Sequence, residues 1–304
     1  MNTSKIYNGI LTRFIKTTFP FWQGLGFHVT PNHFYQPVPD TRTLREELWR
    51  KESEMVGIEM NDSRQMALVS FFASAYGKEY HAFPYEKTEN PQEYYVHNNM
   101  FELVDGGILY SMVRHFKPKR IVEIGSGFST LLTVKAILKN ESVDHSYKCE
   151  FTAIEPHPSD TLKAGVPGLS RLYPTRLENV PRTLFSQLTA GDILFIDSSH
   201  VLKIGSDVQT ELLEILPSLE KGVLVHIHDI FLPAEYPKDW VIKDHVFVNE
   251  QYVMQAFLTF NDHFEIIWAG HYMRLRHHDK LKEAFGRYET DERWPCSLWI
   301  RKTK

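Results

Sequence analysis

The clearest pattern along the chain is a short apolar run, two glycines and then a helical repeat. Residues 121–124 are rich in β-branched side chains and lie between Lys-Pro-Lys and a glycine, which is typical of a buried parallel strand. Gly125 and Gly127 allow a sharp turn, and apolar residues recur at helical spacing from Ser129 onward. The pattern predicts a strand, a glycine turn and a helix, an arrangement that places a nucleotide or nucleoside at a helix N-terminus.

Beyond this stretch, strand-like apolar runs alternate with helical periodicities. Such alternation predicts an α/β fold, with a parallel sheet and helices on both of its faces. Further helices are expected at residues 206–219 and 250–260. The remaining expected strands are residues 149–155, 171–173, 192–197, 222–228, 264–269 and 297–301.

The first part of the chain has a different character. Residues 1–40 are aromatic and punctuated by prolines, which predicts that no continuous helix forms there. Since exposed aromatics at this density are improbable, we expect the segment to pack on the domain as a lid or strap. Helical spacing returns at residues 41–60, 63–75 and 101–116. We therefore expect an N-terminal extension and helical lid over residues 1–95, and a main domain over residues 96–304.

Composition narrows the class of protein. The formal net charge is -4, and there is no basic block or aromatic–basic alternation, so nucleic-acid binding is not expected. No apolar run approaches the roughly 18 residues that span a bilayer, and the N-terminus does not read as a signal peptide. Cys149 and Cys296 are the only cysteines, which excludes a disulfide framework. We expect a cytoplasmic protein without membrane partners.

The glycine turn is not the fingerprint of a dinucleotide-binding protein, because the third glycine is missing. Glu123 lies two residues before the first glycine, where a carboxylate suits a cationic group such as the ammonium of an amino acid rather than a pyrophosphate. The run Val-Glu-Ile-Gly-Ser-Gly, residues 122–127, resembles motif I of class I S-adenosylmethionine-dependent methyltransferases. In that family the turn lies under the methionine part of the cofactor. A generic Rossmann-type turn with another ligand is the alternative.

The resemblance implies a Rossmann-like sheet of seven strands whose last strand inserts antiparallel. It also implies S-adenosylmethionine as the cofactor, with Glu155 at the end of the second strand accepting hydrogen bonds from the ribose hydroxyls. A solvated acid that caps a helix is the alternative for Glu155. Near the adenine, Leu177 and Asn179 are weaker candidates. The expected cofactor-binding residues are Glu123, Gly125, Ser126, Gly127, Ser129, Glu155, Asn179 and Asp197.

Acids and imidazoles follow the next two strands. Asp197 and His200 come after one strand, and His226, His228 and Asp229 end the other. The carboxyl ends of parallel strands meet at one sheet edge, so we expect these side chains over the cofactor cleft, except His226, which lies further back and reads as a core residue. Carboxylates alone suit Mg²⁺, whereas added imidazoles suit Zn²⁺, Fe²⁺ or Mn²⁺. A competing role for the two aspartates is hydrogen bonding to the cofactor amine and loop amides.

Over roughly residues 95–270 the resemblance becomes closer. The runs 195–200, 205–207, 222–229 and 249–252 are similar to bacterial sugar and small-molecule O-methyltransferases and to cephalosporin-hydroxylase-like proteins. In metal-dependent relatives, acids matching Asp197 and Asp229 hold a Mg²⁺ ion that binds two substrate oxygens. Here Ile230 stands where catechol-type relatives carry another oxygen ligand, which leaves His200 or His228 as substitutes.

The leading hypothesis is therefore methyl transfer from S-adenosylmethionine to a small-molecule acceptor, with an oxygen acceptor favoured. Asp197, His200 and His228 are the expected catalytic residues. His200 is the first choice of base, and a metal-bound acceptor is the second. The alternatives are cyclisation of the cofactor with release of methylthioadenosine, a metal-dependent hydroxylase, and a non-catalytic binding protein. Residues 33–35, 233–240 and 271–272 are candidate substrate walls, and the sequence leaves a homodimer open.

Overall fold

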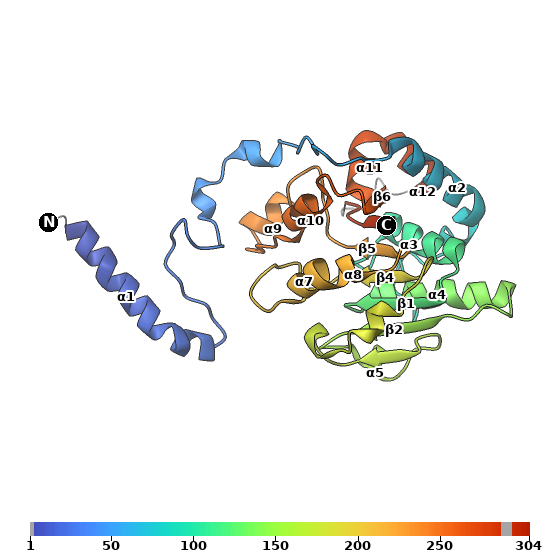
Figure 1. Cartoon of the computed structure of the whole chain (residues 1–304), viewed down its shortest axis with the longest axis horizontal. Helices are drawn as coiled ribbons and strands as arrows, with labels where there is room; N and C mark the ends of the chain where they lie inside the picture. The colour runs from blue at the N-terminus through green and yellow to red at the C-terminus, as the bar shows by residue number, and fades with distance from the viewer. Residues whose placement is uncertain (1–2, 287–293) are drawn as a thin grey trace. The chain divides into compact units, whose positions relative to one another are not determined.

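The computed structural model describes residues 3–286 and 294–304 (Figure 1). The chain divides into two compact units, one formed by residues up to Lys51 with Tyr236–Phe247, the other by Glu52–Glu235 with Val248–Lys304. The first contains α1 (Thr3–Gly24), η1 (Thr41–Thr43), η2 (Glu46–Trp49) and α9 (Lys238–Ile242). The division differs from the expected one at residue 95, because α2 (Asp62–Tyr80) packs on other helices of the second unit.

The second unit is built on a seven-stranded sheet in the order β3-β2-β1-β4-β5-β7-β6. β1 to β5 are parallel, and β7 lies antiparallel between β5 and β6. The expected α/β fold, with a last strand inserted antiparallel, is confirmed. The strands are β1 (Arg120–Ile124), β2 (Glu150–Ile154), β3 (Arg171–Tyr173), β4 (Ile193–Ile196), β5 (Leu224–Ile227), β6 (Phe264–Ala269) and β7 (Leu298–Lys302).

Successive side chains along the central strands point to opposite faces of the sheet, so each strand contributes to two hydrophobic cores. Ile121 and Phe195 enter one core with α2, α3, α4 and α12, whereas Val122 and Leu194 enter the other with η4 and α10. Helices thus cover both faces of the sheet. The longer helices are α3 (Leu103–Phe116), α4 (Phe128–Val143), α10 (Glu250–Leu258), α11 (Gly270–Arg276) and α12 (His278–Phe285). Short elements are α5 (Asp160–Lys163), η3 (Leu177–Asn179), α6 (Thr183–Ser186), α7 (Asp207–Thr210), the π-helical η4 (Glu211–Ile215) and α8 (Leu216–Ser218).

Two expectations for the N-terminal part were wrong. A continuous helix, α1, spans much of the proline-punctuated segment, because the first proline of the sequence is Pro20, close to the end of the helix. The helix expected at residues 41–60 is replaced by η1 and η2. Met55 and Gly57 have positive φ angles there, and a Cβ on Gly57 would lie 2.7 Å from the Phe260 ring. Packing of residues 1–40 on the domain stays a prediction.

Within residues 3–286 and 294–304, each helix is too short or too polar to cross a lipid bilayer.

Candidate functional site

A cleft of about 390 Å³ opens at the carboxyl ends of β1, β2 and β4. This is the edge where open parallel sheets bind ligands. Its walls come from the turns after these strands and from the loop that leads into α7. The lining residues are Ile124, Gly125, Ile154, Glu155, Pro156, His157, Arg176, Leu177, Glu178, Asp197, Ser198, Ser199, Lys203, Gly205, Ser206 and Asp207.

Gly125 forms the floor of the cleft where β1 and β4 end. Its N–H donates to Ile154 O at 2.9 Å, and the N–H of Asp197 donates to Ile124 O at 2.8 Å. The φ angle of Gly125 is +87°, and a Cβ there would lie 2.0 Å from Asp197 O. Both the backbone conformation and the close approach of β4 therefore require glycine.

Glu123 lies beneath the turn rather than in the cleft. Its carboxylate accepts hydrogen bonds from Ser129 Oγ at 2.7 Å and Thr130 Oγ1 at 2.6 Å. Thr130 Oγ1 in turn accepts from the N–H of Gly127 at 3.0 Å. The Glu123 side chain is buried, and burial raises the pKa of its carboxyl group to about 8. Through these hydrogen bonds, Glu123 holds Ser129 and Thr130 in place, and Thr130 in turn holds the backbone of the turn at Gly127.

Of the other residues expected to bind the cofactor, Glu155 lines the cleft, whereas Ser126, Gly127 and Asn179 do not. Glu155 lines the cleft, and its Oε1 accepts from the N–H of His157 at 2.7 Å. The Oγ of Ser126 is buried without a hydrogen-bond partner among the residues that the structure describes. Gly127 lines a separate hollow of about 270 Å³. Asn179 is absent from the lining of the cleft, since its amide donates to Thr175 Oγ1 at 3.1 Å.

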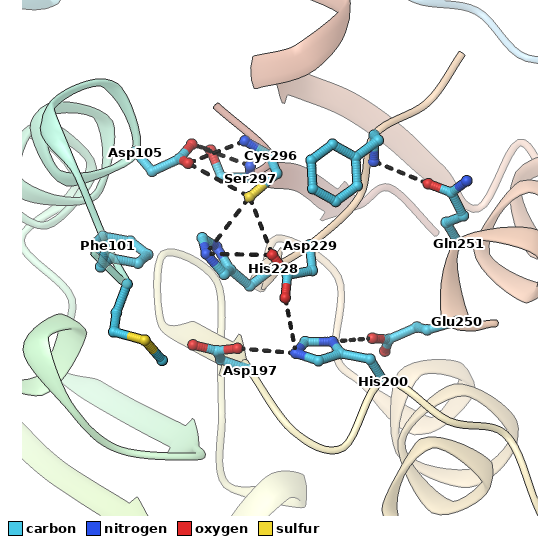
Figure 2. A network of polar contacts seen from close by, with 12 residues as sticks. Phe101, Asp105, Asp197, His200, His228, Asp229, Glu250, Gln251, Cys296 and Ser297 are labelled. Atoms are coloured by element: carbon cyan, nitrogen blue, oxygen red, sulfur yellow. Dashed lines mark hydrogen bonds and ion pairs between the residues drawn. The ribbon is translucent and has the colours of Figure 1, made fainter. Parts of the chain in front are cut away.

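Next to Asp197, which lines the cleft, His200 lies among three carboxylates (Figure 2). Its Nε2 is 3.2 Å from Asp197 Oδ1 and 3.4 Å from Asp229 Oδ2. Its Nδ1 is 2.8 Å from Glu250 Oε2. The donor atoms of Asp197, His200 and Asp229 all lie within 4.8 Å of one another, close enough to hold a metal ion. The three residues are close together, as expected from the sequence, although of the three Asp197 alone lines the cleft.

The charges in this cluster reinforce each other. Although burial opposes a charged ring, the carboxylates of Asp197, Glu250 and Asp229 raise the pKa of His200 well above its ordinary value. Burial also opposes ionisation of Asp197, but nearby imidazoles, chiefly His228 and His200, lower its pKa. His200 is therefore an imidazolium in this arrangement and already carries the proton that a general base would have to accept.

Glu250 and Glu211 are buried acids that the sequence reasoning missed. The N–H of Glu250 donates to His200 O at 3.1 Å, so the histidine contacts the first residue of α10 through both backbone and side chain. Glu211, in the π-helical segment, accepts from Ser198 Oγ at 3.0 Å. Burial, followed by the charges of Glu250 and Asp207, raises the pKa of Glu211 well above its ordinary value. For Glu211, the signal in the sequence is an acidic residue at an apolar position of a helical repeat.

His228 does not line the cleft, contrary to its expected place there. Its Nε2 is 3.6 Å from Cys296 Sγ, and its ring centroid lies 4.9 Å from that of Phe101 (Figure 2). Burial, Asp105 and Asp229 raise the pKa of Cys296 well above its ordinary value, so this cysteine is a neutral thiol. His226 is a core residue as expected, stacked on Phe195 with ring centroids 3.9 Å apart.

Comparisons with known proteins address the same region. Residues 122–230 match the family model described as "Methyltransferase domain". These residues form a methyltransferase domain. The resemblance noted in the sequence is confirmed for this part of the chain, and the sheet that carries the domain has the seven strands and the antiparallel last strand that the resemblance implies.

Two known proteins are similar to the chain. An uncharacterized protein of Archaeoglobus fulgidus is 33% identical over 146 residues, which are 45% of this chain. The chain spans 62% of the length of that curated relative. Among solved structures, an O-methyltransferase from Bacillus cereus in complex with SAH is 11% identical and has a TM-score of 0.38. That comparison covers 80% of this chain and 92% of the other.

The methyltransferase domain contains the whole cleft. All lining residues, from Ile124 to Asp207, lie within it, as does the cluster of Asp197, His200 and Asp229. Glu250 and Cys296 lie outside its bounds but contact cluster residues. The part of the chain that matches the family therefore coincides with the part that forms the candidate site.

Proposed function

We propose that the protein transfers a methyl group from S-adenosylmethionine to a small-molecule acceptor, most suitably to an oxygen. The observation that supports this proposal is the coincidence of the methyltransferase domain with the cleft at the carboxyl edge of the sheet. The cluster of Asp197, His200 and Asp229, which includes one lining residue of that cleft, offers a place for a cation that would bind the acceptor's oxygen.

The residues of the cleft fit S-adenosylmethionine. A volume of about 390 Å³ falls in the range of small-molecule sites. Glu155 presents a carboxylate to the cleft for the ribose hydroxyls. Gly125 lets the backbone approach the ligand without an intervening side chain. Glu123 would act through the turn, because its carboxylate is already engaged by Ser129 and Thr130.

The sulfonium of the cofactor supplies an already activated methyl group, so the protein mainly has to align donor and acceptor. Removal of the acceptor's proton is the harder task for these residues. His200 already carries a proton, and Asp197 has a pKa below its usual range, which makes it a weak base. This charge state favours assistance by a divalent cation over direct base catalysis.

Asp197, His200 and Asp229 are the residues that would hold such a cation. Bound there, it would act as a Lewis acid on an acceptor oxygen. One imidazole with two carboxylates suits Mn²⁺, Fe²⁺ or Zn²⁺ better than Mg²⁺. The Nε2 proton of His200 would leave on binding, so the affinity of the site for metal should rise with pH.

The proposal is tested by calorimetric titration of the purified protein with S-adenosylmethionine, with and without a chelator, followed by chromatography of mixtures incubated with candidate acceptors. Formation of S-adenosylhomocysteine with a methylated acceptor is the expected result. Methylthioadenosine as the product would instead indicate cyclisation of the cofactor. Absence of any binding would overturn the assignment of the cleft.

Substitution Glu155→Gln should weaken cofactor binding about 10- to 100-fold, because a carboxylate that accepts from two hydroxyls is replaced by an amide with one acceptor oxygen. The matched control is Glu150→Gln, at the exposed opposite end of β2. The measurement is the calorimetric Kd of each variant for S-adenosylmethionine. Equal affinities would remove Glu155 from the cofactor site.

A further inference from the structure

A second group of potential metal ligands lies next to Asp229 (Figure 2). It consists of Asp105 on α3, His228 directly after β5 and Cys296 just before β7. The exposed fractions of these residues are 6%, 4% and 6%. Unlike the cluster at the cleft, this group contains a thiol and is closed to solvent.

The distances between its atoms, 3.3–3.9 Å where they are known, approach those around a tetrahedral zinc ion. Cys296 Sγ is 3.6 Å from His228 Nε2 and 3.8 Å from Asp105 Oδ2. A fourth atom, Asp229 Oδ1, is 3.3 Å from Cys296 Sγ and 3.9 Å from His228 Nε2. Tetrahedral bonds of about 2.3 Å to sulfur and about 2.0 Å to nitrogen or oxygen place neighbouring ligand atoms about 3.3–3.6 Å apart.

The surroundings keep these atoms oriented toward each other. Asp105 accepts from the N–H groups of Cys296 at 3.0 Å and Ser297 at 3.1 Å, which fixes the carboxylate beside the thiol. Asp105 Oδ1 also accepts from Ser297 Oγ, whereas Oδ2 accepts from a single N–H, so the second lone pair of Oδ2 leaves Asp105 able to bind a cation. The polar contacts of the His228 ring lie on its Nε2 side, while Phe101 packs against the ring.

We propose that Asp105, His228 and Cys296, with Asp229 Oδ1 as the fourth ligand, bind a borderline-soft divalent ion of the Zn²⁺ class. A thiolate with imidazole and carboxylate is a donor set for zinc rather than for magnesium or calcium. The thiol S–H bond breaks as the sulfur–metal bond forms, and one proton is released to solvent. The ion joins α3, β5 and the start of β7, as closed structural zinc sites join elements.

This ion would also affect the cleft. Asp229 is shared, because its Oδ2 faces His200 at 3.4 Å while its Oδ1 faces Cys296 at 3.3 Å. Binding at Oδ1 therefore fixes the carboxylate whose other oxygen belongs to the cleft cluster. The inference does not depend on the proposed methyl transfer, since it concerns only these buried donors.

The test is a Co²⁺ titration of the full-length, metal-stripped protein, followed through the thiolate-to-cobalt charge-transfer absorption. Wild type should show this band, and Zn²⁺ should displace it. Cys149→Ser, which changes the other cysteine, should keep the band, whereas Cys296→Ser should lose it and weaken Zn²⁺ binding on the order of 100-fold. Asp197→Asn should also keep the band, because Asp197 belongs to the cleft cluster.

X-ray absorption at the zinc edge of the loaded wild-type protein keeps the proposal testable if Cys296→Ser does not fold. One sulfur in the first coordination shell is the expected result. A shell of nitrogen and oxygen alone, or a cobalt band that persists in Cys296→Ser, would overturn the site. Absence of the band in wild type, with cofactor binding retained, would overturn this site and leave the proposed function standing.

Discussion

At the scale of single residues, the floor of the cleft depends on the missing side chain of Gly125 and on the buried carboxyl group of Glu123. Gly125 lets β4 approach the first turn, and Glu123 holds the hydroxyls that shape that turn. Neither residue needs to touch a ligand to matter. Their effects should appear first in the stability of the protein.

Substitution Gly125→Ala should destabilise the fold by more than about 3 kcal/mol, since strain at positive φ adds to a collision with Asp197 O. Gly191 provides the matched control, because its φ is also +87° but a Cβ there would have no atom within 4 Å. Gly191→Ala should cost only the strain of about 1 kcal/mol. Urea unfolding of both variants measures the difference, and similar losses would show that the close approach is unimportant.

The buried carboxyl group of Glu123 predicts that the free energy of unfolding depends on pH. Burial raises the folded-state pKa from 4.5 to about 8, so the folded protein keeps a proton that the unfolded chain releases. The stability contribution is complete below about pH 4.5 and is lost as pH rises through about 8. Between about pH 6 and about pH 9, wild type should lose about 2–3 kcal/mol relative to Glu123→Gln. Unfolding free energies that change in parallel for the two proteins would contradict this.

At the scale of elements, α2 is joined to the edge of the sheet by buried side-chain hydrogen bonds. Gln65 Oε1 accepts from the N–H of Ala269 at 2.7 Å, and its Nε2 donates to Met60 O at 2.6 Å. Asn61 Nδ2 donates to Ile266 O at 2.9 Å. The bonds to Ala269 and Ile266 satisfy backbone groups of β6 and help to explain why α2 belongs to the same unit as the sheet.

Substitution Gln65→Leu should therefore cost about 2–4 kcal/mol, because it leaves two backbone groups buried and unpaired. The neighbouring Arg64→Ala is the control. Arg64 forms an ion pair with Glu265 at 2.8 Å, but its side chain is 72% exposed, so the loss should stay below about 1 kcal/mol. Thermal unfolding of the two variants provides the comparison. Equal losses would mean that α2 is held by its apolar contacts alone.

At the scale of the whole molecule, the sheet could be predicted from the sequence because each central strand is a local apolar run. The turn at Gly125 and the acids after β4 and β5 followed from the same local signals. The N-terminal helix was missed because proline density over residues 1–40 obscured a proline-free start. Asp105 and Cys296 could not be paired from the sequence, since they lie 191 residues apart and meet only after β7 has inserted.

The position of β7 also has a consequence for the order of synthesis. β7 pairs with β5 on one side and β6 on the other, yet it follows both in the chain. During synthesis, β5 and β6 are therefore made before β7. Until β7 is added, the edge of each strand that pairs with β7 has unpaired backbone groups. An open strand edge is a template for pairing with other chains. A translational pause before residue 298 would prolong this exposure, and nascent chains stalled there should depend most on chaperones.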